Sequence, residues 1–355
     1  RGQWFDPTSR YHLHKNYALK MKNFILNNFI LVIFFSLLIP IYYTFDTNFP
    51  LQNNFFPWDS HYYAKLALSF KFNETLPLVS DPWGYRILFP FLFGKLSLHS
   101  GLELVQSALI VNIVSFYLSI LVYLKLCESY NVSKIFSFLI IFIYLLYWNG
   151  QLRHAIFLGG YSFCFDTFCI TIYLYSIYKA LLENDKFLSV SAYFIGALFI
   201  FQRPIIILFL PILILIFFIF VERLKLSQNY LSTKNKFFLI KLIILSIVIF
   251  IASKFILNVS NSGYSILHMI FTSIQFNLNL SDLLYIFYFS LGPVFLYFVN
   301  LVLLKKKILI HIFNKKIYSN INKKELLNIN IILISLFFTL IGGADSDRFL
   351  LWFIF

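Results

Sequence analysis

Charged residues are scarce in this sequence: Asp, Glu, Lys and Arg make up 12% of its 355 residues, about half the share found in soluble domains. Hydrophobic residues make up 60%, aromatic residues 21%, and the mean hydropathy is +0.78. A soluble globule cannot bury that much apolar surface, and a disordered chain would be far more polar. The composition therefore predicts an all-α, polytopic membrane protein, folded as a bundle of transmembrane helices.

Cysteine is nearly absent, and the signatures of several enzyme classes are missing. Cys127, Cys164 and Cys169 lie in or beside apolar runs, and their spacing fits neither a zinc site nor a disulfide framework. We therefore expect them to be small buried side chains. The chain has no phosphate-binding glycine loop, no HExxH and no GxSxG.

Long apolar runs are what the sequence does contain, and they predict nine to ten spans. We place spans near residues 24–43, 102–124, 135–148, 156–178, 187–202, 204–221, 237–257, 282–304 and 327–343, with a tenth from Phe349. The run 86–98 is too short to cross alone, so we expect it in the interface or in a broken span. Residues 24–355 would form one transmembrane domain that continues beyond the last residue, and residues 1–20 would precede the native start at Met21.

The net charge of +14 comes from loops that alternate along the chain. Of 29 Lys and Arg residues, 21 lie in the segments 1–23, 125–134, 179–186, 222–241 and 305–326. Under the positive-inside rule these segments face the cytoplasm, so no nucleic-acid partner is needed to explain the charge. The rule predicts a multi-pass protein, for which a bacterial inner membrane is expected, with a cytoplasmic N-terminal segment and residues 44–85 as a first extracytoplasmic loop.

This expected first extracytoplasmic loop concentrates the side chains that could carry chemistry. Asp59 follows Trp58 and precedes SHYYAKLALSF, a pattern that predicts a helix lying on the outer membrane surface. Asp59 can cap that helix or act as a general base, and Asp81 lies in the same loop. With His61, these carboxylates could bind a divalent cation. The alternative is that they are ordinary solvated loop residues.

Cations recur in the other expected outer loops. Arg86 enters the apolar run 86–98, where it could reach water or bind a lipid phosphate. Arg203 precedes Pro204, a residue that favours the first turn of a helix, in a very short loop. The other polar residues of these loops are Arg153, His154, Asp345, Asp347 and Arg348.

Asp166 lies inside the predicted span 156–178. An ionised carboxylate at the centre of a bilayer costs about 2.5–3.5 kcal/mol, so we expect Asp166 to face the bundle interior or a wet cavity. A functional role, a hydrogen bond between packed helices and a position near the membrane boundary all remain open for this residue.

Several of these segments together resemble the C-type (GT-C) membrane glycosyltransferases, in particular their mannosyltransferase-like branch. FPWDSHYYAKLAL and DPWGYRILFPFL are similar to the family's first outer loop, in which Trp-Asp precedes a Tyr-rich helix and Tyr-Arg follows. FQRPIIILFLP resembles its Arg-Pro at the start of a later span, and GADSDRFLLW its late Asp-x-x-Arg element. The first loop differs from the family in lacking an Asp-x-Asp or Glu-Glu pair, a spacing that Asp345 and Asp347 have in a later loop.

The resemblance implies an inverting sugar transfer outside the cytoplasm, within a surface-glycan pathway of the cell envelope. The donor would be a polyprenyl-phosphate-linked sugar, and the acceptor a glycan, a lipid or a protein. The resemblance implies that Asp59 is the catalytic base, with Asp81 as the second candidate. The implied substrate-binding residues are His61, Tyr62, Arg86, Arg153, Arg203, Asp347 and Arg348. A divalent cation, Mg²⁺ or Mn²⁺, stays open as a cofactor, and no metal ligands are assigned.

Two other function classes remain as alternatives. Polysaccharide polymerases and flippases of outer-sugar pathways are also polytopic and rich in Phe and Ile, but they usually carry a large outer loop late in the chain, whereas here it comes first. A transporter would carry charged residues along its spans together with repeat symmetry, and only Asp166 fits that description.

Overall fold

A computed structural model describes residues 60–80, 83–129, 137, 162–183, 186–223, 232–257 and 259–260, all within one compact unit of residues 50–355. These residues form seven α-helices, one 3-10 helix and one pair of very short strands, so the described part of the chain is helical, as predicted. The helices are α2 (Ser60–Phe72), α3 (Leu88–Ser100), α4 (Leu104–Ser129), α7 (Phe163–Glu183), α8 (Lys186–Phe199), α9 (Pro204–Arg223) and α10 (Thr233–Ile256). The short elements are β1 (Val79–Ser80), η2 (Trp83–Tyr85) and β2 (Val259–Ser260).

Two of the described helices are long and apolar enough to cross a membrane. They are the Leu104–Lys125 part of α4, with a mean hydropathy of 2.1, and α10, with 2.5. The 24 residues of α10 rise about 36 Å, which exceeds the roughly 30 Å thickness of a hydrocarbon core. In contrast, the 14 residues of α8 rise only about 21 Å, too little to cross alone.

Helix α10 has a largely apolar outer face, which also carries the exposed Lys241, and a partly polar inner face. Phe237, Ile244 and Val248 are 58%, 55% and 56% exposed and lie along one stripe of the helix. The buried residues of α10 include the polar Asn235, Ser246 and Ser253 beside three apolar side chains. A helix of a soluble protein has the opposite arrangement, so this pattern indicates apolar surroundings.

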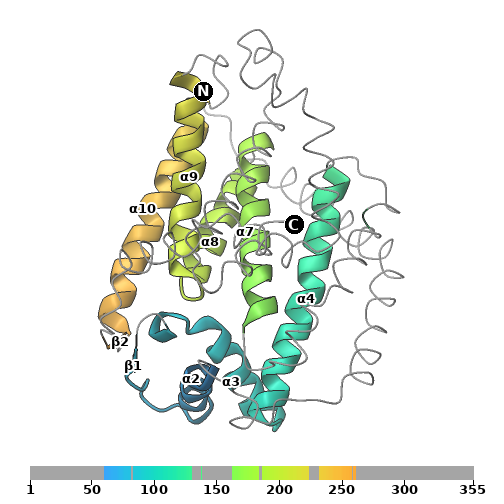
Figure 1. The fold of residues 1–355 in the computed structure, drawn as a ribbon, viewed down its shortest axis with the longest axis vertical. Coiled ribbons are helices and arrows are strands. Elements are labelled where there is room, and N and C mark those ends of the chain that lie inside the picture. Colours follow the sequence, from blue (N-terminus) through green and yellow to red (C-terminus); the bar gives the residue numbers. More distant parts are fainter. Residues whose placement is uncertain are drawn as a thin grey trace, which may run out of the picture. The chain divides into compact units, whose positions relative to one another are not determined.

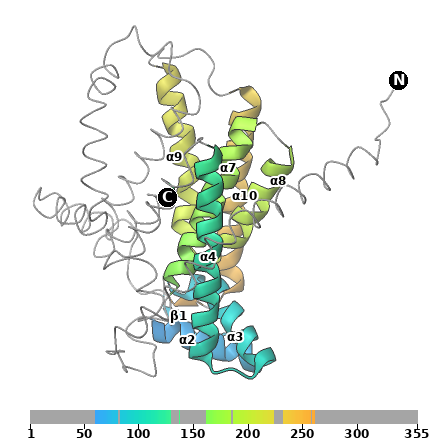
Figure 2. The ribbon, with the colours of Figure 1, turned by 90° about the vertical axis from the view of Figure 1, so that its right-hand side faces the viewer.

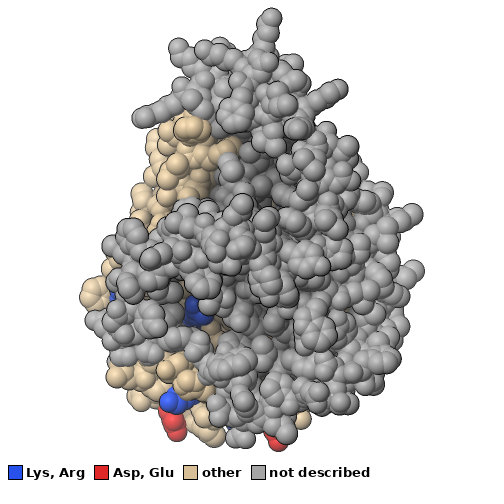
Figure 3. Space-filling model, in the orientation of Figure 1, with Lys and Arg blue, Asp and Glu red and all other residues tan. Residues whose placement is uncertain are grey.

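Charged side chains of the described residues are unevenly distributed over one face of the molecule. On the face drawn in Figure 3, charged atoms of described residues appear only in the lower half, and the described surface above them is uncharged. The upper part of that surface lies where α9 and α10 run in the same view (Figure 1). Charged side chains also lie at the opposite end of these helices, where Lys236 of α10 pairs with Glu222 of α9.

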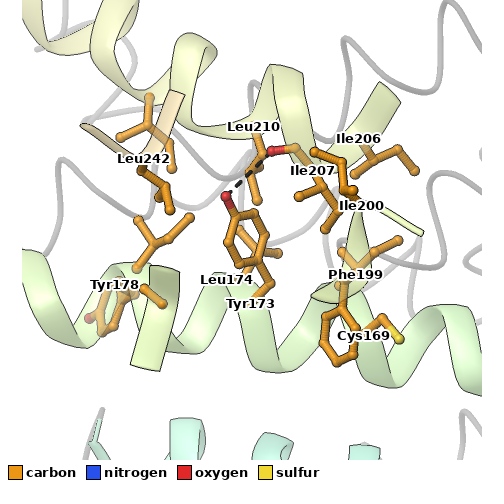
Figure 4. Close-up of a cluster of buried hydrophobic side chains, with 14 of the residues drawn as sticks. Cys169, Tyr173, Leu174, Tyr178, Phe199, Ile200, Ile206, Ile207, Leu210 and Leu242 are labelled. Carbon is orange, nitrogen blue, oxygen red and sulfur yellow. Dashed lines mark hydrogen bonds between the residues drawn. The ribbon is translucent and has the colours of Figure 1, made fainter. Parts of the chain in front are cut away.

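The core forms where α7 meets its neighbours α4, α8, α9 and α10. Figure 4 shows this packing of apolar side chains around Tyr173 of α7. The labelled side chains are Cys169, Tyr173, Leu174 and Tyr178 of α7, Phe199 of α8, Ile200 of the following turn, Ile206, Ile207 and Leu210 of α9, and Leu242 of α10. On α4, Ser115 and Ser119 are buried and donate to main-chain oxygens one turn earlier, at 2.6 and 2.8 Å. Small hydroxyl residues let membrane helices approach closely.

A proline inside α9 explains one polar contact of this core. Pro211 has no N–H to donate to the carbonyl of Ile207, one turn earlier in the helix. The Tyr173 hydroxyl donates to that carbonyl oxygen instead, at 3.4 Å (Figure 4). The side chain of one helix thus supplies a hydrogen bond that the backbone of another cannot make.

Helices α2 and α3 pack on each other at one end of the longer helices (Figures 1 and 2). Gly94 permits the close crossing, because a Cβ atom there would lie 2.5 Å from the main-chain oxygen of Ala67. Gly101 ends α3 with a φ of 71°, which glycine adopts readily, and its N–H donates to the Ser97 oxygen at 3.1 Å. The chain then enters α4. We call this region, with the starts of α7 and α9, the α2–α3 end.

The α2–α3 end also receives the last described residues after α10. Strand β1 pairs in parallel with β2, with Val79 opposite Val259 and Ser80 opposite Ser260. The ring of Tyr85, in η2, lies 5.6 Å from the ring of Phe250 in α10. Both contacts place the C-terminal part of α10 and the residues after it beside the segment that joins α2 to α3.

The helices fit the sequence prediction well in position and less well in length. The helix predicted from SHYYAKLALSF is confirmed as α2, and α3 is a short helix, as the length of the run 86–98 implied. Pro204 is the first residue of α9, as its preference for that position predicted. The predicted span 187–202 was too long, since α8 ends at Phe199 and residues 200–202 form a turn. Predicted spans 24–43, 135–148, 282–304, 327–343 and the one from Phe349 lie outside the described residues, apart from residue 137.

Candidate functional site

A cluster of buried polar side chains lies at the α2–α3 end, around the carboxylate of Asp166. This residue sits in the first turn of α7, and its side chain is fully buried. Asp166 therefore faces the interior, as expected, and of the three alternatives its position favours a helix-packing role near a helix end. A negative charge in the first turn also interacts favourably with the helix dipole.

Three side chains donate hydrogen bonds to Asp166. The Ser162 hydroxyl, just before α7, donates to Oδ2 at 2.9 Å. The Gln202 amide, in the α8–α9 turn, donates to Oδ1 at 2.6 Å. Arg203 forms an ion pair with Oδ2 through Nη2. A buried carboxylate needs such partners, and these three contacts supply them to both oxygens of Asp166.

Gln202 extends the cluster to the start of α3. Its side-chain oxygen accepts the main-chain N–H of Phe89 at 3.0 Å, and Gln202 is fully buried. Next to it, the N–H of Leu88 donates to the main-chain oxygen of Phe201 at 3.1 Å. The first N–H groups of a helix have no partner inside the helix, and here the α8–α9 turn supplies one. The turn thereby fixes α3 against α7 and α9.

Arg86 lies two residues before α3 and is therefore carried by the same contacts. Its Nη1 donates to the hydroxyl oxygen of Tyr63 at 3.2 Å. Tyr63 belongs to α2 and is 1% exposed, and its ring meets the ring of Phe89 edge to face, with centroids 6.1 Å apart. Two cations expected to bind substrate, Arg86 and Arg203, are thus held by segments that touch each other.

The described charged groups of this cluster are Asp166, Arg203 and Arg86. Asp166 and Arg203 neutralise each other, since they form a direct ion pair with side chains 0% and 11% exposed. Arg86 contacts the neutral hydroxyl of Tyr63. These three groups together carry one net positive charge, which attracts an anion.

His61 and Tyr62 lie in the first turn of α2, as the sequence predicted for a helix at this position. Their rings are in contact, with centroids 3.9 Å apart, and both side chains are half-buried. The Lys65 ammonium lies 6.0 Å from the Tyr62 ring centroid. This group is polar and aromatic, a combination that suits the ring of a sugar or a nucleobase.

The other predicted site residues lie outside the described residues. They are Asp59, Asp81, Arg153, Asp347 and Arg348. Sequence reasoning missed the roles of Ser162, Gln202 and Tyr63. The signal for Ser162 was its place one helical turn before Asp166, and for Gln202 a polar residue that interrupts an apolar run beside Arg203. Tyr63 had no signal that set it apart from Tyr62.

No group of three or more His, Cys, Asp and Glu side chains that could bind a metal ion occurs among the residues that the structure describes. No protein-family model, no curated protein and no solved structure gives a significant match to this chain. The chemistry of the cluster itself is therefore the basis of a functional assignment.

Proposed function

We propose that the protein is a polytopic membrane glycosyltransferase that moves a sugar from a polyprenyl-phosphate-linked donor to an acceptor on the extracytoplasmic side. The supporting observation is the α2–α3 end, where the segments that carry Arg86 and Arg203 meet through two hydrogen bonds. This end adjoins the termini of α4 and α10, the helices long enough to cross a membrane. A lipid-linked phosphate lies near the membrane surface, at the ends of spanning helices, and cations there can bind it.

The charge of the cluster suits this donor. A sugar linked through one phosphate to a polyprenyl chain is a phosphodiester with a single negative charge. The net charge of Arg86, Arg203 and Asp166 is a single positive one. As the sugar leaves, the phosphate gains a second negative charge, and cations already in position stabilise that change without rearrangement.

The proposed reaction is an inverting substitution at the anomeric carbon. Asp59 removes the proton of the acceptor hydroxyl, and the oxygen forms a bond to the anomeric carbon. The bond from that carbon to the phosphate oxygen breaks, and its electron pair leaves with the polyprenyl phosphate. Arg86 binds this phosphate directly, and Arg203 contributes a second, partly neutralised cation.

A transporter finds less support in the described residues. Transport by a helical bundle relies on charged groups near the middle of its spans. Asp166, the residue that suggested it, lies in the first turn of α7 and is paired with Arg203. Such a pair near a helix end is suited to holding helices together.

The test is an assay of the purified protein with a panel of polyprenyl-phosphate sugars. Release of free polyprenyl phosphate is measured, with and without Mg²⁺ or Mn²⁺. We expect release from at least one donor, and abolition of release by Asp59→Asn with unchanged expression and folding. Glu74→Gln, which changes an exposed carboxylate after α2, is the matched control and should retain activity. Failure to release lipid phosphate from any donor would contradict the proposal, and full turnover by Asp59→Asn would remove that residue from the mechanism.

A further inference from the structure

We infer that Asp166 and Gln202 are positioning residues, which hold Arg203 and, through the start of α3, Arg86 in fixed places at the α2–α3 end. The inference rests on the proposed function only for what the two arginines bind. The positioning itself follows from the contacts among α3, α7 and the α8–α9 turn.

The first step is the position of Arg203. Its guanidinium is bound by the buried carboxylate of Asp166, which Ser162 and Gln202 hold from two other directions. A carboxylate with donors on both oxygens cannot rotate without losing one of them. Arg203 also precedes α9, whose Ile207 N–H donates to the Arg203 oxygen at 3.1 Å. Both the main chain and the side chain of Arg203 are therefore fixed.

The second step is the position of Arg86. Gln202 uses its two amide atoms for different partners, since Nε2 donates to Asp166 and Oε1 accepts from Phe89. One side chain thus connects the carboxylate on α7 to the first turn of α3. Because Arg86 lies only two residues before α3, a movement of that turn moves Arg86 as well.

The third step is that these residues do not act on a substrate themselves. Asp166 and Gln202 are both 0% exposed, and their side chains form hydrogen bonds with each other and with Ser162, Arg203 and Phe89. They act through the arginines that they orient. Losing them should loosen the geometry of the cation pair more than it changes the chemistry that the cations perform.

The first experiment measures position directly in the full-length protein. In a background of Cys127→Ser, Cys164→Ala and Cys169→Ala, the changes Leu88→Cys and Phe201→Cys introduce two thiols at main-chain neighbours, whose closeness permits a disulfide. We expect rapid oxidation to the disulfide, and a several-fold slower rate after Asp166→Asn or Gln202→Met.

The matched control is Asn235→Ala. Asn235 is buried and donates to the Leu181 oxygen at 3.2 Å, at the other end of α7. It should lower thermal stability without slowing disulfide formation, because it leaves the α2–α3 end intact. Rates are compared below the unfolding temperature of every variant. Unchanged rates in both Asp166→Asn and Gln202→Met would overturn the inference, as would an equal slowing by Asn235→Ala.

The second experiment measures the consequence for an anion. Farnesyl phosphate is the probe, with farnesol as the uncharged control, and binding is measured in detergent. Gln202→Met is the informative variant because it leaves all charges in place. We expect it to raise the Kd for farnesyl phosphate about tenfold, and Asn235→Ala to leave the Kd nearly unchanged. An unchanged Kd in Gln202→Met would refute the positioning of the anion-binding cations.

The two experiments separate the inference from the proposed function. If wild-type protein binds farnesyl phosphate no better than farnesol, the phosphate site of the proposed function fails. The disulfide rates then still decide whether Asp166 and Gln202 fix the two arginine-bearing segments, because those rates require no ligand.

Discussion

The two ends of the described helices use charged residues in different ways. At the α2–α3 end, Asp166 and Arg203 are enclosed and connect α7 to the α8–α9 turn. At the opposite end, formed by the last turns of α7 and α9 and the first turns of α10, the pairs are partly open to solvent. Lys179 and Glu183 lie one turn apart on α7, with side chains 17% and 46% exposed. Lys236 of α10 meets Glu222 of α9, with side chains 36% and 21% exposed.

The buried ion pair therefore holds helices in place, whereas the exposed ion pairs lie in contact with solvent. An exposed ion pair loses little when it opens, because water replaces each partner. A buried pair has no such replacement, so it keeps its geometry or the surrounding helices move. The α2–α3 end is therefore the part of the described bundle in which a fixed arrangement of cations can be maintained.

The largest expected effect comes from removing one partner of the buried pair. Arg203→Leu leaves the Asp166 carboxylate buried without its cation, which should cost about 3–5 kcal/mol of stability. The double change Asp166→Leu with Arg203→Leu should recover most of that loss. Thermal unfolding in detergent measures both. If the single change were tolerated as well as the double one, the two ends would not differ in the way described.

A smaller effect is expected from the helix crossing at the same end. Gly94→Ala would place a Cβ atom 2.5 Å from the main-chain oxygen of Ala67, and relieving that overlap should cost about 1–3 kcal/mol. Adding Ala67→Gly should not restore stability, because the obstructing atom belongs to the backbone. Rescue by this second change would show that the helices contact each other through side chains instead.

The smallest effect is expected at the opposite end. Lys236→Gln or Glu222→Gln should change stability by less than about 1 kcal/mol, and the change should shrink further in high salt. The measurement is the unfolding temperature of each variant at low and at high ionic strength. A loss comparable to that of Arg203→Leu would remove the contrast between the two ends.

Local patterns predicted the helices well, since each depends on neighbours in sequence. Pro204 marks the start of α9 because its ring suits a first helical turn, and the Tyr-rich pattern after Asp59 gave α2. The end of α8 was predicted too late, because Ile200 and Phe201 continue the apolar pattern up to Gln202.

The contacts of the candidate site could not be predicted in the same way. Asp166 and Arg203 are 37 residues apart, and Gln202 and Phe89 are 113 apart. Their meeting depends on how α3, α7, α8 and α9 pack, which a single sequence does not encode in any local pattern. The sequence did indicate that a charge at Asp166 needs a partner, because an isolated carboxylate in apolar surroundings is costly.

The missing N–H of Pro211 has an evolutionary consequence. Its absence leaves the Ile207 carbonyl to the Tyr173 hydroxyl, so the proline and the tyrosine stabilise the protein as a pair. In a descendant without this proline, the N–H of residue 211 would donate to the Ile207 carbonyl. The Tyr173 hydroxyl would then no longer be needed there, and phenylalanine could replace the tyrosine. An alignment of descendants should therefore show substitutions at Pro211 and Tyr173 occurring together, with loss of the proline as the first step.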